Sequence, residues 1–304
     1  MKKVLITGSN GLLGQKLSDL YMSLPDIQFL ATGPGENRHP QGKKVPFASL
    51  DIRDKQAVMT LFMDFRPDCV IHTAAMTNVD QCEKEKEACR NLNVSAVEGI
   101  IDACNVVGAQ LIHLSTDFIF DGEAGPYKEE DLPNPISYYG ESKLAGEKLV
   151  QEKAQNWAIA RTVLVYGIVN DMSRSNIVLW AKGALESGKE INVVTDQFRS
   201  PTLAEDLAMG CRLIEKHEAK GIFNISGKDF MSVFELVERV AKFWKLPLDK
   251  VHPSDSKGIN QPAKRPPVTG FIIDKAIREL GYAPHSFEEG IAVLERQLAA
   301  IEST

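Results

Sequence analysis

The apolar residues of the N-terminal half fall into short runs, separated by longer stretches in which apolar residues recur every three or four positions. The short runs lie at 4–6, 27–31, 69–71, 110–114 and 158–161, and the amphipathic stretches lie at 12–21, 57–65, 83–107 and 139–155. Strands that alternate with helices predict βαβ units around a parallel sheet. Nearly continuous apolar strands predict helices on both faces of that sheet. We therefore expect an α/β fold with a doubly wound parallel sheet.

The pattern loosens after Tyr166 and Gly167. Helical spacing returns at 176–185 and 233–243, strand-like runs lie at 192–194 and 221–225, and prolines recur at 247, 253 and 262–267. This change predicts a second, smaller lobe built mostly from the C-terminal third. We assign 1–166, with roughly 201–226, to the sheet domain. We assign 167–200 and 227–304 to the smaller lobe.

Composition and charge exclude several classes of protein. The 304 residues are 43% apolar and 25% charged, as in ordinary globular chains, and the net charge is −6. No strong basic field is available to hold nucleic acid or an anionic membrane. No run of about 18 apolar residues could span a bilayer, and the N-terminal apolar run is too short for a secretory signal. Five cysteines without a CxxC spacing predict a reducing, cytoplasmic location and no cysteine-based metal site.

A glycine-rich turn follows the first predicted strand. Gly8, Gly11 and Gly14 form a G-x-x-G-x-x-G pattern that opens the first helix, with Asn10, Leu12 and Leu13 between them. Glycines there let the backbone turn and approach a pyrophosphate, and the helix N-terminus offers free N–H groups. A tight strand–helix turn alone also tolerates glycines, but the position at the start of a βαβ chain favours a Rossmann-type dinucleotide site.

The end of the second strand bears on which dinucleotide binds. An acidic residue there favours NAD, because it hydrogen-bonds the ribose 2′-hydroxyl. This strand ends at Thr32 and Gly33 without an acid, and Arg38 follows, with Lys43 and Lys44 beyond it. These cations favour the 2′-phosphate of NADP(H), with NAD(H) as the alternative. Further along, Asp51 and Ile52 follow the third strand and are candidates to frame the adenine.

Tyr139 and Lys143 form a Y-x-x-x-K pair at the start of a predicted helix. Residues four apart share a helix face, so the phenol and the ammonium lie side by side. A neighbouring cation lowers the pKa of a phenol, which suits proton exchange near neutral pH. Thr116 ends a strand, where open α/β sheets bind ligands, and its hydroxyl suits a substrate carbonyl. We expect these three residues to form one site.

At these residues the chain resembles the extended short-chain dehydrogenase/reductases, and within them the dTDP-4-dehydrorhamnose reductase family. The resemblance covers essentially the whole chain. Its most specific segments are 115–122 (STDFIFDG) and 196–202 (DQFRSPT), supported by 74–80 (AAMTNVD), 139–147 (YGESKLAGE) and 264–266 (KRP).

The resemblance implies the roles of individual residues. Tyr139 would give a proton to the C4 oxygen, Lys143 would tune it, and Thr116 would orient the carbonyl while the nicotinamide supplies hydride to C4. Thr116 and Asp117 would touch the sugar. The residues that would line the cofactor are Gly11, Leu12, Leu13, Asp51, Ile52, Ala75, Met76 and Thr77, with Gly8, Asn10, Gly14 and Ala74 beside them. Tyr139 and Lys143 are also expected to contact the cofactor, Lys143 at the nicotinamide ribose.

The expected substrate is a nucleotide sugar, dTDP-4-dehydro-L-rhamnose, reduced to dTDP-L-rhamnose for cell-surface polysaccharide biosynthesis. Arg199 and Arg265 are candidates to meet its diphosphate, because an arginine gives phosphate two parallel donors. A surface salt bridge is the alternative for each arginine. The sequence leaves the oligomeric state open, a homodimer included, and marks no metal site.

Three positions depart from the family pattern. His72 precedes the alanines where a small residue or Asn is expected, and we interpret it as a packed or hydrogen-bonded side chain. Leu164 stands where the family often has a Trp that meets the sugar. Arg199 stands where a glycine is common.

Two alternatives remain open on the sequence. Sugar-nucleotide epimerases and dehydratases share this fold, but dehydratases usually place a Glu where this chain has Phe118. Some relatives resemble regulatory subunits that bind NADP and a partner such as methionine adenosyltransferase. The intact Thr116, Tyr139 and Lys143 favour catalysis.

Overall fold

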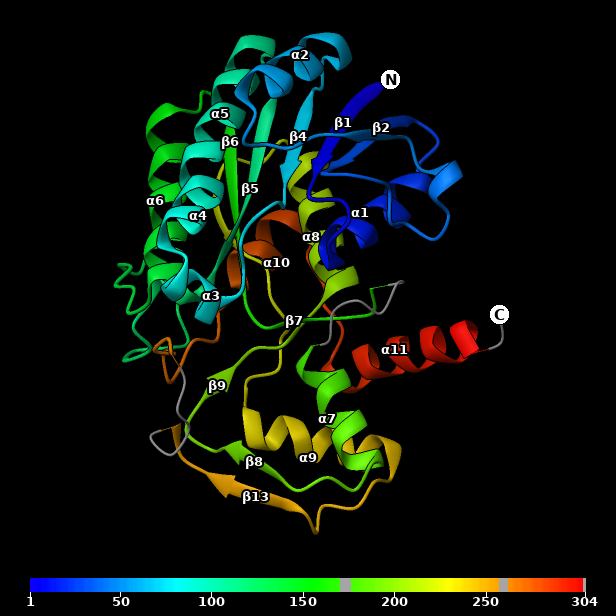
Figure 1. The fold of residues 1–304 in the computed structure, drawn as a ribbon, viewed down its shortest axis with the longest axis vertical. Coiled ribbons are helices and arrows are strands. Elements are labelled where there is room, and N and C mark those ends of the chain that lie inside the picture. The colour runs from blue at the N-terminus through cyan, green and yellow to red at the C-terminus, as the bar shows by residue number, and fades with distance from the viewer. Residues whose placement is uncertain (170–175, 257–261, 303–304) are drawn as a thin grey trace.

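The computed structural model describes residues 1–169, 176–256 and 262–302. Residues 170–175, 257–261 and 303–304 of the expected smaller lobe lie outside the described residues. Seven parallel strands form the main sheet in the order β11-β6-β5-β4-β1-β2-β3 (Figure 1). Their bounds are β1 Lys2–Thr7, β2 Ile27–Gly33, β3 Phe47–Ser49, β4 Cys69–His72, β5 Gln110–Thr116, β6 Trp157–Thr162 and β11 Gly221–Asn224. The order reverses between β1 and β4, and such a reversal opens a crevice at the strand ends.

Helices cover both faces of this sheet, which confirms the predicted doubly wound fold (Figure 1). One face carries α1 (Leu12–Met22), α8 (Ala204–Lys216) and α10 (Asp274–Leu280); the other carries α2 (Lys55–Phe65), α5 (Ala96–Val107) and α6 (Tyr138–Lys153). Because successive residues of a strand point to opposite faces of the sheet, the core is divided between the two faces. In β1, Val4 and Ile6 pack with the α1 side while Leu5 packs with the α5 side, and all three are fully buried.

The single long helix expected over 83–107 is wrong. The segment begins earlier and is broken into α3 (Val79–Lys84), α4 (Lys86–Arg90), a π-helical turn (Asn91–Ser95) and α5. Asn78 starts α3, because its side chain accepts a hydrogen bond from the Gln81 N–H. Glu85 then leaves the helical region, with φ −119° and ψ 55°. Apolar spacing alone could not show this break.

The smaller lobe has its own core below the sheet in Figure 1. It contains α7 (Ile177–Glu186), α9 (Val233–Trp244) and α11 (Phe287–Glu302), with the parallel pair β8 (Ile191–Val194) and β13 (Val251–Ser254). Two further pairs of short strands are β7 (Val165–Tyr166) with β10 (Thr202–Leu203) and β9 (Phe198–Arg199) with β12 (Met231–Ser232). A single bridge also joins Phe198 to Val268. Segments distant in sequence therefore meet beside the sheet.

One part of the C-terminal third does not pack in that lobe. Phe271, Ile273 and Leu280 pack in the core of the α1 face, and α10 contacts α8 and β11. The expected boundary of 227–304 is therefore wrong for this segment, because its apolar residues complete the sheet domain. The sequence pattern also missed helices α8, α10 and α11. None of the helices among the described residues is long and apolar enough to cross a membrane.

Candidate active site

A cavity of about 890 Å³ lies at the C-terminal ends of β1, β4, β5 and β6, within the size range of small-molecule sites. Every residue predicted from the sequence to line the cofactor contributes to its wall. We call its two parts the glycine end, made by Gly8, Asn10, Gly11, Leu12, Leu13, Gly14, Asp51 and Ile52, and the tyrosine end, made by Thr116, Asp117, Tyr139, Lys143 and Arg199. The loop of Ala74, Ala75, Met76 and Thr77 lies along the wall between them.

Two positions of the turn at the glycine end require a residue without a side chain. Gly8 has φ +71°, and a Cβ there would lie 2.7 Å from the Ala74 nitrogen. A Cβ on Gly14 would lie 2.4 Å from the Gly8 carbonyl oxygen. Gly11 precedes α1 without a side-chain cap, so the first N–H groups of the helix remain available. This surface fits a closely approaching pyrophosphate.

Two arginines lie at the glycine end, and they differ in whether the guanidinium group already has a partner in the protein. Arg53 donates to both oxygens of the Asp51 carboxylate, at 2.9 and 3.1 Å from Nε and 2.5 Å from Nη2. These hydrogen bonds lower the pKa of Asp51. Arg38 also lines the cavity, held through its backbone N–H by the Asn10 side chain at 2.9 Å. Within the described residues its guanidinium has no hydrogen-bond or ion-pair partner, so it remains available to a ligand.

Asn93, which the sequence analysis missed, holds the loop between the two ends. Its Oδ1 accepts from the Met76 N–H at 2.8 Å, and its Nδ2 donates to the Met76 carbonyl at 3.0 Å. The same Nδ2 also lies 3.0 Å from the Ser142 hydroxyl on α6. Asn93 lies in the π-helical turn, a feature frequent at functional sites. Apolar spacing carries no signal for such a turn.

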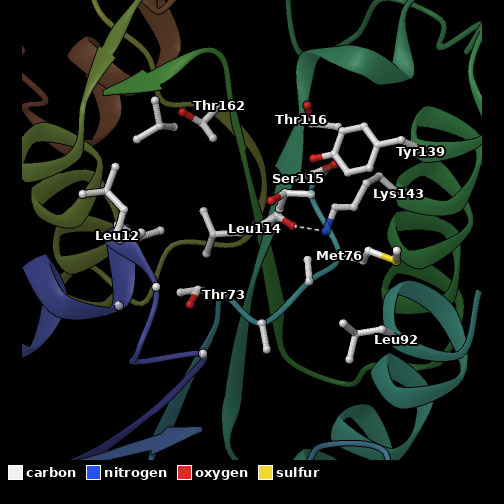
Figure 2. Close-up of a pocket in the computed structure, with 18 of the residues that line it drawn as sticks. Leu12, Thr73, Met76, Leu92, Leu114, Ser115, Thr116, Tyr139, Lys143 and Thr162 are labelled. Atoms are coloured by element: carbon white, nitrogen blue, oxygen red, sulfur yellow. Dashed lines mark hydrogen bonds between the residues drawn. The ribbon is translucent and has the colours of Figure 1, made fainter. Parts of the chain in front are cut away.

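The tyrosine end brings together the three predicted reactive residues (Figure 2). Ser137 caps α6 and places Tyr139 and Lys143 on the face toward β5. The Lys143 ammonium donates to the Leu114 carbonyl at 2.7 Å. Figure 2 shows the Tyr139 ring beside Thr116 and above Lys143. All three side chains are buried in the wall of the cavity.

Burial governs how these groups titrate. It raises the pKa of Tyr139, although a hydrogen bond with Thr116 acts in the opposite direction. In the protein alone, desolvation therefore outweighs the lowering of the phenol pKa that was expected from Lys143, whose ammonium donates to the Leu114 carbonyl. Burial also lowers the pKa of Lys143 to about 8. Both shifts favour the neutral forms, which is the direction expected for buried groups.

Asp117 and Arg199 form a buried charged pair at the tyrosine end. Asp117 accepts from the Thr116 hydroxyl at 3.0 Å and from the Thr269 hydroxyl. Arg199 Nε lies 3.9 Å from Asp117 Oδ2, the oxygen that also accepts from Thr269. Burial raises the pKa of Asp117, and the charge of Arg199 opposes that rise. Asp117 contributes to the cavity wall from the turn that follows β5, and Arg199 contributes from β9.

Both arginines predicted to meet a diphosphate have partners within the protein. The Arg199 Nη atoms donate to the carbonyls of Phe198, Pro266 and Pro267. Arg265 donates to both oxygens of Asp80, at 3.2 and 2.8 Å, and does not line the cavity. The terminal nitrogens of both arginines already donate within the protein, which disfavours the diphosphate contact predicted for them. Arg265 has the salt bridge considered as its alternative.

The match to known proteins follows this geometry. A family profile described as "RmlD substrate binding domain" matches residues 1–299. The chain belongs to the RmlD family. The dTDP-4-dehydrorhamnose reductase of Bacillus anthracis, solved in complex with NADP, is 30% identical, with a TM-score of 0.83 over 98% of this chain and 100% of that one. The Clostridium acetobutylicum protein, described as a dTDP-4-dehydrorhamnose reductase, is 28% identical, with a TM-score of 0.86 over 98% and 99%.

Similar RmlD-family sequences carry two kinds of name. Methionine adenosyltransferase 2 subunit beta of Bos taurus is 34% identical over 271 residues, 87% of this chain and 78% of that protein. A probable low-salt glycan biosynthesis reductase, Agl14, of Haloferax volcanii is 30% identical over 292 residues, 95% and 96% of the two chains. Membership in the RmlD family therefore does not by itself choose between a reductase and a subunit of another enzyme.

Several lining residues of this RmlD-family site were not predicted. They include Thr73, Ser115 and Thr162, which end or follow strands. Leu164, which stands where the family often has a Trp, also lines the cavity, with φ +43°. The rule that ligands bind at strand ends could have found the hydroxyl residues. His72 is buried with Nδ1 2.7 Å from the Thr7 hydroxyl, as interpreted from the sequence. Among the described residues, no group of three or more potential ligand side chains gathers around a metal position.

Proposed function

We propose that this protein reduces the C4 ketone of a nucleotide-activated deoxysugar, with dTDP-4-dehydro-L-rhamnose as the substrate and dTDP-L-rhamnose as the product. The observation that carries the proposal is the convergence of Thr116, Tyr139 and Lys143 on one wall of a cavity that continues to the glycine end. That arrangement suits a ketone held by hydroxyl groups beside a dinucleotide. The similar reductases support the choice of substrate.

The residues of the chain would act on the ketone oxygen. Thr116 and Tyr139 would hold this oxygen, and Tyr139 would give its proton as negative charge develops there. The raised phenol pKa keeps the proton on Tyr139 before reaction. Lys143, fixed by the Leu114 carbonyl, places a positive charge beneath the site and stabilises the phenolate that results.

The glycine end would hold a nicotinamide dinucleotide, which supplies the hydride when it is bound. Gly8 and Gly14 would allow the pyrophosphate its close approach, and Asp51, which lines the same cavity, would contact the adenine. Arg38 supports a preference for NADP(H), because its available guanidinium suits a 2′-phosphate. Arg53 is occupied by Asp51 and suits that role less well.

The site favours reduction over the related elimination. Phe118 lies against the Tyr139 ring, with centroids 5.7 Å apart, at the position where a dehydratase usually has Glu. A phenyl ring cannot exchange the proton that elimination needs. Purified protein that carried stoichiometric NAD and interconverted sugar epimers would instead support an epimerase.

A direct assay tests the proposal. Purified protein is mixed with NADPH and dTDP-4-dehydro-L-rhamnose made in situ, and a panel of other 4-keto nucleotide sugars is run beside it. We expect NADPH oxidation coupled to accumulation of dTDP-L-rhamnose. Reduction of another sugar alone would overturn the named substrate, whereas no turnover of any sugar would overturn the reductase assignment.

The 34% sequence identity with a methionine adenosyltransferase subunit favours a second candidate function. In this function the protein would be a regulatory subunit that binds NADP and a partner enzyme. Pull-down with a methionine adenosyltransferase separates the two functions. A stable complex together with an inactive sugar panel would support the subunit. Turnover without a complex would support the reductase.

A further inference from the structure

Cys82 and Cys89 are two buried cysteines that the broken helical segment brings together. Residues seven apart in one continuous α-helix lie about 10 Å apart along its axis, whereas a disulfide needs Cα atoms within about 7 Å. Here the chain leaves the helical region at Glu85, and α3 and α4 contact each other. The two cysteines pack in one cluster with Tyr139, and their thiols hydrogen-bond each other. The break in the helix therefore creates a dithiol.

The hydrogen bonds of this dithiol reach helix α6 and the loop between the two ends of the cavity. Cys82 Sγ lies 3.7 Å from the carbonyl oxygen of Met76, which lines the cavity. Cys89 Sγ lies 3.3 Å from the Ser142 hydroxyl on α6 and 3.4 Å from Asn93 Nδ2. Asn93 in turn bonds both backbone groups of Met76. A change at either sulfur atom therefore acts on the loop that carries Met76.

The two thiols differ in reactivity. Hydrogen bonding from Cys82 lowers the pKa of the Cys89 thiol to about 7, and the same contact raises the pKa of Cys82. Because the thiolate is the form that attacks an oxidant, Cys89 is the nucleophile and Cys82 is the second thiol. Both sulfur atoms are buried, but Gln81, Glu85 and Ala88 on the same segment line the cavity. The dithiol thus lies directly behind the cavity wall, where a small oxidant is required.

We propose that Cys82 and Cys89 form an oxidation site for hydroperoxides, which closes to a disulfide and weakens dinucleotide binding through Met76. The Cys89 thiolate attacks one peroxide oxygen, so that an S–O bond forms, the O–O bond breaks, and the released hydroxide takes up the proton lost by Cys89. The Cys82 sulfur then attacks Cys89, so that the S–S bond forms and the S–O bond breaks. The hydroxyl leaves as water with the Cys82 proton. Two thiols and one hydrogen peroxide thus give one disulfide and two waters.

A disulfide would change the network in one direction. Its sulfur atoms lie about 2 Å apart, closer than two hydrogen-bonded thiols, so Cys82 and Cys89 must approach each other. Both thiol protons are lost, and Cys82 can no longer donate to the Met76 carbonyl. That carbonyl then keeps only the hydrogen bond from Asn93 among the two it has in the reduced protein. The effect on dinucleotide binding rests on the proposed function, whereas the oxidation itself does not.

Treatment of the purified protein with hydrogen peroxide tests both parts. Intact mass and peptide mapping follow the cysteines, and calorimetry gives NADP⁺ affinity before oxidation, after it, and after reduction with dithiothreitol. We expect the parent to lose the mass of two hydrogen atoms, with Cys82 linked to Cys89. Its NADP⁺ affinity should fall about fivefold, the effect of one lost hydrogen bond. Reduction should restore the affinity.

Two variants separate the dithiol from the other cysteines. In Cys82→Ala, oxidation of Cys89 should stop at the sulfenic acid, which dimedone traps. Cys104 supplies the matched control, because it is also buried and burial raises the pKa of its thiol. Cys104→Ala should form the disulfide and lose NADP⁺ affinity as the parent does.

The outcomes distinguish this inference from the proposed function. A parent without a Cys82–Cys89 disulfide after peroxide treatment would overturn the oxidation site. A Cys82–Cys89 disulfide that leaves NADP⁺ affinity unchanged would overturn its effect on the loop. A reduced parent that binds no NADP⁺ contradicts the dinucleotide site of the proposed function, and peptide mapping still decides whether the dithiol is oxidised.

Discussion

The glycine end of the cavity is shaped mainly by the backbone of one short turn at 8–14, whereas the tyrosine end is built from charged and hydroxyl side chains on distant segments. Gly8 and Gly14 act through the space they leave. Asp117 and Arg199 act through charge, and they come from the sheet and from β9 of the smaller lobe. Changes at the glycine end should therefore act by steric exclusion, and changes at the tyrosine end by altered chemistry with the fold retained.

Tyr139→Phe should give the largest effect on reaction. Loss of the phenolic proton should lower kcat about 10²–10⁴-fold, while the fold and NADPH affinity remain. Steady-state kinetics with the reducible sugar, and NADPH titration by fluorescence, measure the two quantities.

The neighbouring residue offers a control for the same chemical change. Tyr138 lies next in the chain, contacts Lys86, and does not line the cavity. Tyr138→Phe should keep kcat within about twofold. Comparable kcat values for the two variants would remove Tyr139 from the mechanism.

Gly14→Val should act mainly on cofactor binding and stability. Its Cβ would meet the Gly8 carbonyl and the Ser9 Cα at 2.4 Å, so α1 must shift away from the turn. We expect a loss of about 1–3 kcal/mol in the free energy of unfolding, as for overpacked cores, with weakened NADPH binding. Urea unfolding and NADPH titration measure both effects.

Gly183 on α7 is the matched control, because a Cβ there meets no heavy atom within 4 Å. Gly183→Ala should raise the free energy of unfolding by about 0.5–1 kcal/mol and leave NADPH affinity unchanged. Equal destabilisation by both variants would contradict a specific steric role for Gly14.

The same contrast explains what the sequence could predict. Gly8–Gly14 and Ala74–Thr77 are contiguous motifs whose positions follow from strand and helix order, and they line the cavity as expected. Arg199 and Arg265 could not be assigned, because their partners Pro266 and Asp80 are fixed only when the smaller lobe packs on the sheet. The break at Glu85 and the π-helical turn that carries Asn93 depend on hydrogen bonds that apolar periodicity does not encode.

Arg38→Ala tests whether charge also operates at the glycine end. Because Arg38 has an available guanidinium, its removal should weaken NADPH binding about tenfold and leave NADH binding unchanged. Dissociation constants for both cofactors decide the point. Arg53→Ala is the control, since Arg53 pairs with Asp51, and it should change NADPH affinity less. A larger loss in Arg53→Ala would transfer the 2′-phosphate contact to Arg53.

The pH dependence of NADPH binding is the smallest expected effect. It concerns both ends of the cavity, because Lys143 at the tyrosine end is also expected to contact the cofactor that the glycine end would hold. Burial lowers the pKa of Lys143 to about 8. Below that value the ammonium donates as a cation, and above it the amine is neutral. Affinity should therefore be constant at lower pH and fall about fivefold as pH rises through 8, the difference between a charged and a neutral hydrogen bond.

Cys89 must be separated from Lys143 in this experiment, because hydrogen bonding from Cys82 lowers the pKa of the Cys89 thiol to about 7. Cys89→Ser removes the titration of this thiol, and NADPH affinity should still fall as the pH rises through 8. Lys143→Met should bind NADPH weakly at every pH and lose the fall, since no ammonium remains to deprotonate. The opposite result is a fall in NADPH affinity that persists in Lys143→Met but vanishes in Cys89→Ser. That result would assign the pH dependence to the Cys89 thiol rather than to Lys143.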